Sequence, residues 1–364
     1  MSTVDPETTA VPNLSTAPPN FAESVFFGPF GMRAGWGILL FFVLSICLAF
    51  GIGYGLLKVS GQLPGYQRLQ TRERADRQQA LQTHTRPPVH PLRIKLGIFG
   101  ESLQAGAVLL AALGISFLEH RRFASYGLRR QGLRDLLPGA FWGLVAMGML
   151  VGLLRAFRLV LFDQRLLSGS AILRYGAVWM LMFLLVGLAE EFLFRGYIQF
   201  TLTRGLVGLT QRLSPAHVRT LAFWLSALVW SVVFFVAHVG NAGETAPGLA
   251  GVFLAGILFS YALWRTGSLW WGIGFHMTWD WAQSFLFGVP DSGTLSVGRL
   301  FATHAAGNPL LSGGVDGPEG SLLMLPVLLL IFVVLRFHPQ VEQPALEPES
   351  LPMFLHPSRP ERIA

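Results

Sequence analysis

The sequence predicts an all-α fold, a polytopic transmembrane helix bundle of about eight helices. Two observations of composition support this: 52% of the residues are hydrophobic and only 13% are charged, whereas a soluble globular chain carries about 25% charged residues. The mean hydropathy is +0.51. The third observation is a series of apolar runs close to the length of about 20 residues that a helix needs to cross a bilayer. A soluble globular enzyme is therefore excluded.

Apolar runs divide the chain into its predicted elements. Residues 1–34 and 338–364 are polar and rich in Pro, which predicts disordered tails. Residues 35–120 are expected to hold N-terminal transmembrane helices with a basic loop, and residues 121–337 the main membrane domain. The predicted spans are Trp36–Leu57, Leu96–Leu118, Leu136–Leu154, Ala177–Phe200, Leu221–Val239, Leu249–Leu263, Leu269–Phe287 and Leu322–Leu335.

Arginine placement orients the bundle, because cytoplasmic loops carry an excess of Lys and Arg. Simple alternation puts the arginines before the third, fifth and seventh runs on one face, which predicts that this face and both termini are cytoplasmic. The arginine-rich connection from Lys58 to Lys95 would then lie outside. We therefore expect an irregular second run, which also carries Glu101. The predicted location is the bacterial inner membrane, as a multi-pass protein with lipid as its neighbour and no nucleic-acid partner.

Charged residues interrupt the fourth run, where Glu190, Glu191 and Arg195 lie among apolar side chains. A charge at bilayer depth costs about 2.5 to 3.5 kcal/mol on insertion scales, so it marks a site or has a partner. Glu191 and Arg195 are four residues apart and share a helix face, where they can pair. Glu190 points about 100° away, toward neighbouring helices. The alternative is that both acids are polar links between helices.

Histidines at two other helices complete a possible hydrolytic site. His238 ends the fifth run, and His276 and Asp280 lie at i and i+4 in the seventh. Each alone fits a structural role. Taken together with Glu190, these residues suit hydrolysis. A carboxylate near an imidazole can bind and deprotonate a water, and a second histidine can stabilise an oxyanion. Asp280 can donate to that oxyanion only when protonated; otherwise it orients His276.

Three motifs at these positions resemble those of the CAAX prenyl protease and bacteriocin-processing (CPBP, or Abi) family of intramembrane endopeptidases. Their order and spacing match as well. The motifs are Glu190–Arg195 (EExxxR), Phe234–His238 (FxxxH) and His276–Asp280 (HxxxN/D), with further similarity at Phe123–Leu128, Gly267–Trp271 and Gly317–Leu322. The resemblance covers about residues 121–335.

The resemblance implies a glutamate-dependent intramembrane endopeptidase that hydrolyses a peptide bond in a peptide or membrane-associated protein, in a cavity that opens within the membrane. Glu190 and His238 would activate water, and His276 with Asp280 would stabilise the oxyanion. Glu191, Arg195 and Phe234 would support the site. Eukaryotic prenyl-protein processing members usually have Asn at the position of Asp280, whereas Asp occurs in bacterial relatives.

Several alternatives stay open at this stage. The chain has no H-E-x-x-H zinc-protease helix, yet Glu190, His238 and His276 could form a His₂Glu zinc set. A metal-free general-base mechanism fits the same residues and is favoured. A proton-coupled transporter would also place carboxylates and histidines in the membrane. A non-catalytic bacteriocin-immunity or scaffold protein is the third possibility.

Overall fold

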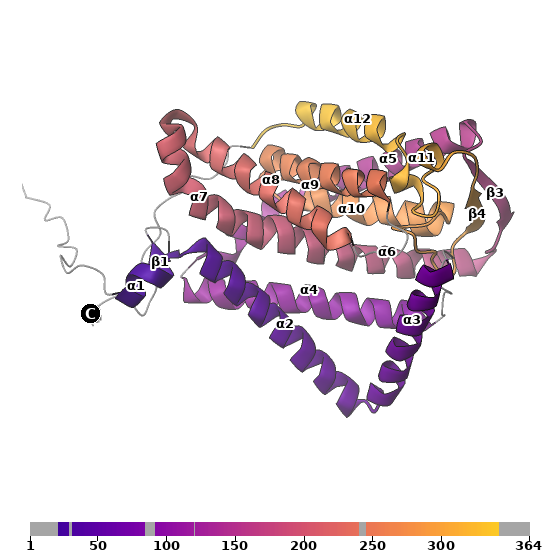
Figure 1. Ribbon diagram of the computed structural model, residues 1–364, viewed down its shortest axis with the longest axis horizontal. Helices are drawn as coiled ribbons and strands as arrows, with labels where there is room; N and C mark the ends of the chain where they lie inside the picture. The colour runs from indigo at the N-terminus through magenta and orange to yellow at the C-terminus, as the bar shows by residue number, and fades with distance from the viewer. Residues whose placement is uncertain (1–20, 29–30, 84–91, 120, 240–244, 342–364) are drawn as a thin grey trace, which may run out of the picture.

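The computed structural model describes residues 21–28, 31–83, 92–119, 121–239 and 245–341 (Figure 1). Helices make up 78% of this part, and the predicted all-α bundle is confirmed. The helices are α1 (Phe21–Phe26), α2 (Ala34–Val59), α3 (Leu63–Thr83), α4 (Leu92–Leu118), α5 (Leu136–Ala156), α6 (Ser170–Glu191), α7 (Phe200–Leu213), α8 (Val218–His238), α9 (Ala246–Thr266), α10 (Trp270–Trp281), α11 (Pro309–Ser312) and α12 (Met324–Phe337).

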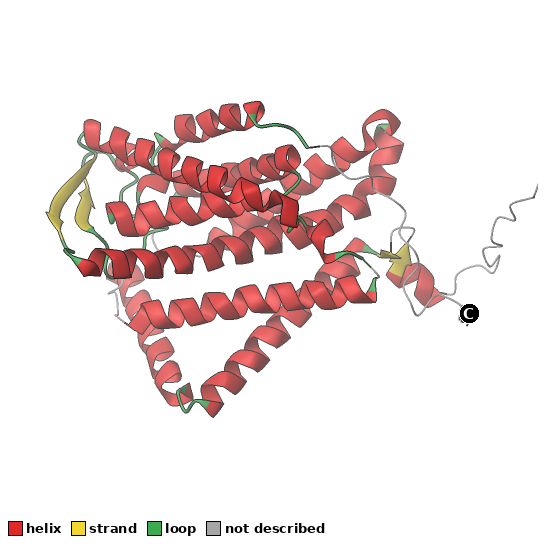
Figure 2. Cartoon of the chain, turned by 180° about the vertical axis from the view of Figure 1, so that it is seen from behind, coloured by secondary structure: helices red, strands yellow, loops and turns green. Residues whose placement is uncertain are grey.

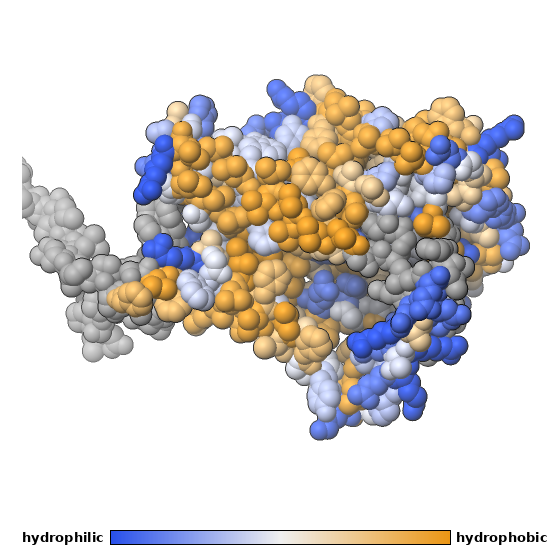
Figure 3. All heavy atoms as spheres, viewed as in Figure 1, coloured by the Kyte–Doolittle hydropathy of each residue, from blue (hydrophilic) through white to orange (hydrophobic). Residues whose placement is uncertain are grey.

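Six helical segments in the described part are long and apolar enough to cross a membrane. All eight predicted runs are helical, but the last two are shorter than a span requires. Helix α10 has 12 residues before its geometry changes, and α12 has 14. Apolar side chains cover much of the middle of the face in Figure 3, and polar ones gather at its ends and along α3. Outward-facing apolar residues such as Phe50, 75% exposed, fit a lipid environment.

The N-terminal region differs from expectation in three places. The second run is a regular helix, α4, with Glu101 inside it. Much of the predicted basic loop is the polar helix α3, which returns from the far end of α2 toward the bundle (Figure 1). Within the predicted N-terminal tail, α1 and a ribbon of β1 (Phe27–Gly28) and β2 (Gly31–Met32) are formed. Residues 1–20 and 342–364 of the predicted tails lie outside the described residues.

Glycines bring α5 and α10 into backbone contact at the centre of the bundle. A Cβ on Gly139 would lie 2.0 Å from the carbonyl oxygen of Trp271, and one on Gly274 would lie 2.1 Å from that of Leu136. Gly143 meets the Phe275 carbonyl in the same way, at 2.2 Å. The GxxxG spacing of Gly139 and Gly143 therefore serves packing within the chain. It fixes the position of α10, which carries His276 and Asp280.

A two-stranded ribbon at one end of the bundle was not predicted (Figure 2). Strand β3 (Val160–Arg165) pairs antiparallel with β4 (Phe301–Ala305), with an irregularity between Phe162 and Gln164. The Thr303 hydroxyl also donates to the Gly288 carbonyl at 2.8 Å. These contacts tie the long connection at residues 288–320 to the α5–α6 connection. They hold it at the end of the bundle where α10 finishes.

Candidate active site

One cavity of about 270 Å³ gathers the four residues predicted to be catalytic. Glu190 comes from the end of α6, His238 from the last position of α8, and His276 and Asp280 from α10. The structure thus brings together side chains that lie on three helices and up to 90 residues apart in sequence. Phe234, predicted as a supporting residue, lines the same cavity.

Glu191 and Arg195 form the ion pair expected from their spacing. Arg195 Nη1 donates to Glu191 Oε1 at 3.1 Å, and the two side chains are 3% and 2% exposed. The guanidinium also lies over the rings of Phe234 and Phe259, at 4.7 and 5.2 Å from their centroids. Arg195 therefore neutralises a buried carboxylate and fixes two aromatic walls of the cavity.

His276 lies between two carboxylates. Its Nδ1 is 3.3 Å from Glu191 Oε1, and its Nε2 is 3.4 Å from Asp280 Oδ2. The ring stacks on Phe259 with 5.4 Å between centroids. A carboxylate accepts, so a histidine that satisfies both contacts donates from both nitrogens as an imidazolium. This geometry favours the orienting role for Asp280, and it gives Glu191 a contact with His276 that was not predicted.

His238 is oriented by its own helix. Its Nδ1 lies 2.8 Å from the carbonyl oxygen of Phe234, one turn earlier, and the two rings pack edge to face at 4.5 Å. Because a carbonyl only accepts, Nδ1 is the donor in this contact, which selects the tautomer whose Nε2 has a lone pair. The FxxxH spacing thus leaves Nε2 of His238 as a hydrogen-bond acceptor at the cavity. The side chain of Glu190, partly exposed on the cavity wall, makes no hydrogen bond to another described residue.

Two π-helical stretches begin directly after the site residues. Phe192–Gln199 follows Glu191, and Ala282–Phe287 follows Trp281, the residue after Asp280. Such wide turns are rare and occur often at functional sites. The apolar periodicity of these segments contains no signal for them. They show that both helices of the Glu191–His276 contact change their winding at the cavity.

The connection at residues 288–320 contributes two carboxylates that were not predicted, Asp291 and Glu319. Glu319 Oε1 accepts from Trp279 Nε1 at 2.9 Å. Asp291 Oδ2 accepts from the Ser284 hydroxyl at 2.9 Å. Burial, followed by the charge of Glu319, raises the pKa of Asp291 to about 7. The similarity of Gly317–Leu322 to the family was the available signal for Glu319; Asp291 had none.

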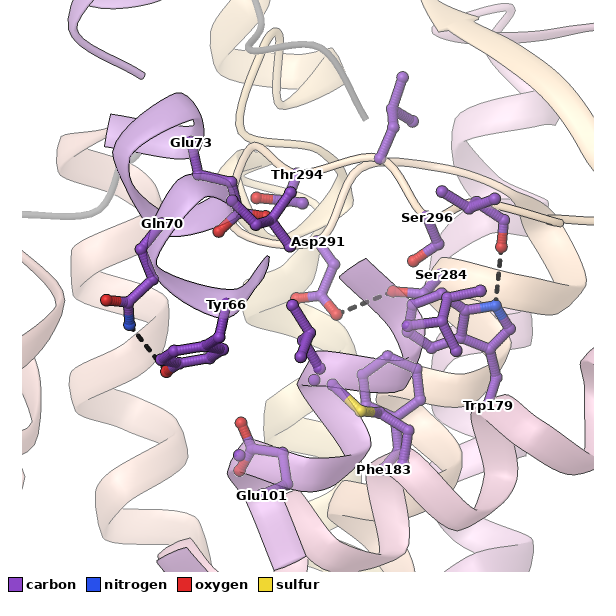
Figure 4. A pocket seen from close by; sticks show the side chains of 18 residues that line it. Tyr66, Gln70, Glu73, Glu101, Trp179, Phe183, Ser284, Asp291, Thr294 and Ser296 are labelled. Carbon is purple, nitrogen blue, oxygen red and sulfur yellow. Dashed lines mark hydrogen bonds between the residues drawn. The ribbon is translucent and has the colours of Figure 1, made fainter. Parts of the chain in front are cut away.

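A second cavity of about 380 Å³ adjoins the first and shares Phe183 and Asp291 with it. In Figure 4, Asp291 and its hydrogen bond to Ser284 lie on one side of this cavity, and Glu101 of α4 lies on another. Helix α3 supplies the outer wall through Tyr66, Leu69, Gln70 and Glu73. The polar helix within the predicted basic loop therefore lies next to the candidate site.

Zinc does not fit the arrangement of these side chains. In the described part of the chain, no group of three or more His, Cys, Asp or Glu residues is placed to hold a metal ion. Both ring nitrogens of His276 face carboxylates, so neither has a lone pair directed toward Glu190 and His238. The proposed His₂Glu set of Glu190, His238 and His276 is not assembled, and no reaction step is assigned to a metal.

Comparison with protein families identifies a match over part of the chain. Residues 172–282 match the type II CAAX prenyl endopeptidase Rce1-like family. No curated protein and no solved structure matches the chain. The matched segment contains all three motifs and confirms the resemblance to CPBP intramembrane proteases. It supports endopeptidase activity, a peptide or protein substrate, and integral multi-pass membrane embedding.

Proposed function

From the match of residues 172–282 to Rce1-like endopeptidases, we propose that the chain is an intramembrane endopeptidase with Glu190 as its general base. The observation that carries this proposal is the shared cavity, in which an unpaired Glu190 faces the same space as His238 and His276. The substrate is a peptide or a membrane-associated protein segment. Nothing in the cavity requires a prenyl group.

Water activation uses Glu190 and His238. A water held by the Glu190 carboxylate and by Nε2 of His238 loses a proton to Glu190 as its oxygen attacks the peptide carbonyl. The hydrogen bond from His238 Nδ1 to Phe234 supports this role, because it selects the tautomer whose Nε2 accepts. Collapse of the tetrahedral intermediate breaks the C–N bond, and the proton on Glu190 passes to the departing amine.

Oxyanion stabilisation is assigned to His276. Its contact with Asp280 is long, at 3.4 Å, so the Nε2–H group can turn toward a developing oxyanion while Asp280 keeps the ring in place. Glu191 holds the opposite ring nitrogen. An imidazolium favours the negative charge of the intermediate over the neutral substrate, which is the differential stabilisation that catalysis requires.

The test is a comparison of membrane proteomes from cells that carry the intact chain or Glu190→Gln. Glutamine keeps the shape of the side chain and removes the basic oxygen. We expect uncleaved substrate species to accumulate in the variant. Asp163→Asn is the control, because Asp163 lies on β3, is 44% exposed and pairs with His304 outside the cavity. Unchanged proteolysis in Glu190→Gln would overturn the proposal and favour a scaffold.

A further inference from the structure

A small cavity lies near the end of α8 opposite to His238. It has a volume of about 110 Å³, and the side chains around it include three arginines, Arg129, Arg195 and Arg219. Arg219 is the second residue of α8 and His238 the last, so they lie about 29 Å apart along the helix. Among the residues that the structure describes, no carboxylate lines this cavity. The charged residues of its lining are therefore basic, whereas acidic residues line the candidate active site.

A buried amide in the cavity wall lacks an acceptor. Gln199 is 1% exposed, and its Oε1 accepts from the Ser260 hydroxyl at 3.0 Å. Its Nε2 has no hydrogen-bond partner among the described residues. A buried donor left unpaired costs about 1 to 3 kcal/mol, and such groups in native proteins call for an explanation. An acceptor supplied by a ligand would satisfy it.

The donors in this cavity suit a phosphate group. Three arginines from separate elements line the cavity, of which Arg195 is also paired with Glu191, and the Gln199 amide belongs to the same wall. A carboxylate has two oxygens, whereas a phosphate monoester presents three strong acceptors and more charge. Phe200, Phe223 and Trp264 supply apolar walls next to the arginines. We propose that this cavity binds a phosphate group, carried either by an anionic lipid headgroup or by a free phosphate ion.

Arg195 links this phosphate cavity to the candidate active site. It lines the phosphate cavity, and its Nη1 holds Glu191 Oε1, the oxygen that also contacts His276. A phosphate bound beside Arg195 would thus be connected to His276 through Arg195 and Glu191. The proposal for binding does not depend on proteolysis, and its test measures binding alone.

The experiment uses the purified full-length protein after removal of bound lipid. Affinity is measured by titration with inorganic phosphate, with short-chain phosphatidylglycerol, and with the matching uncharged diacylglycerol. Trp264 in the cavity wall supplies a fluorescence signal. The variants are Arg219→Gln, Arg129→Gln and Gln199→Met. Arg212→Gln is the control, because Arg212 is an exposed arginine near the end of α7 that does not line the cavity.

We expect a phosphate-bearing probe to bind and Arg219→Gln or Arg129→Gln to weaken it about tenfold, as loss of one charge-assisted contact predicts. Binding of phosphatidylglycerol alone identifies a lipid headgroup as the ligand, and binding of inorganic phosphate as well identifies a site for the free ion. Arg129 is partly exposed and Arg219 is exposed, so their variants test the site even if Gln199→Met fails to fold. Equal weakening in Arg212→Gln, equal binding of diacylglycerol, or no binding would overturn the proposal.

Discussion

Nδ1 of His276 lies 3.3 Å from Oε1 of Glu191, and the same oxygen accepts from Arg195. One oxygen atom of Glu191 thus connects the EExxxR motif on α6 with the HxxxN/D motif on α10. Glu191 therefore contacts both Arg195, its ion-pair partner, and His276, which lines the cavity. In the proposed mechanism Glu191 is a positioning residue, because it would act on the reaction through His276.

Substitution of Glu191 by Gln should destabilise the protein and disturb His276. Breaking one side of a buried ion pair costs about 3 to 5 kcal/mol, since Arg195 would lose its counter-charge. We expect a clear fall in Tm, measured by thermal unfolding in detergent, together with a changed pH profile of cleavage. Glu190→Gln should keep its Tm, because Glu190 has no such partner. Equal Tm values for both variants would contradict the assignment.

His238→Gln should lower kcat by about 10² to 10⁴, the usual contribution of a positioned acid–base group. Phe234→Leu should have a smaller effect, because its backbone carbonyl still accepts from His238 Nδ1 while the ring contact is lost. Cleavage kinetics on a substrate found in the proteome comparison measure both. The proposed role of His238 fails if the two variants are equally active.

Stability should fall as the pH rises from about 4 to 7, because of Asp291. Its pKa is raised to about 7 in the folded chain, whereas an unfolded Asp titrates near 3.9. Between these values the folded state binds the extra proton, so the free energy of unfolding decreases with pH. Asp291→Asn should flatten this slope in thermal unfolding measured across the range.

Ser284→Ala is the matched variant for this pH dependence. The Ser284 hydroxyl donates to Asp291 and lowers its pKa, against the larger effect of burial. Its removal should extend the falling part of the stability curve to higher pH. A slope that is the same in wild type, Asp291→Asn and Ser284→Ala would exclude Asp291 as its source.

Gly139→Ala should displace α10. The added Cβ would lie 2.0 Å from the Trp271 carbonyl oxygen, so one of the two backbones must move. Overpacking typically costs about 1 to 3 kcal/mol, and cleavage should fall with it because His276 shifts. Gly152→Ala on the same helix is the control, since its Cβ would meet nothing within 4 Å. Thermal unfolding and cleavage of the two variants should differ clearly.

Local patterns in the sequence determined which segments are helical and which charges pair within a helix. The eight apolar runs are all helical, because a segment that crosses lipid needs a continuous apolar surface. The Glu191–Arg195 pair and the His276–Asp280 contact follow from i,i+4 geometry, which any helix imposes. The Phe234–His238 contact has the same origin. Hydropathy was less informative about α3, whose residues are mostly polar.

Only the tertiary structure decided how these local units meet. The contact between Glu191 and His276 joins residues 85 positions apart and depends on how α6 and α10 pack. The backbone contact of α5 with α10 appears only in the fold, where Gly139 lies against the carbonyl of Trp271. Asp291 and Glu319 reach the cavity because the connection at residues 288–320 folds over the end of the bundle. Spacing along one helix sets neighbours a turn apart, whereas contacts between helices depend on the packing of side chains from distant parts of the chain.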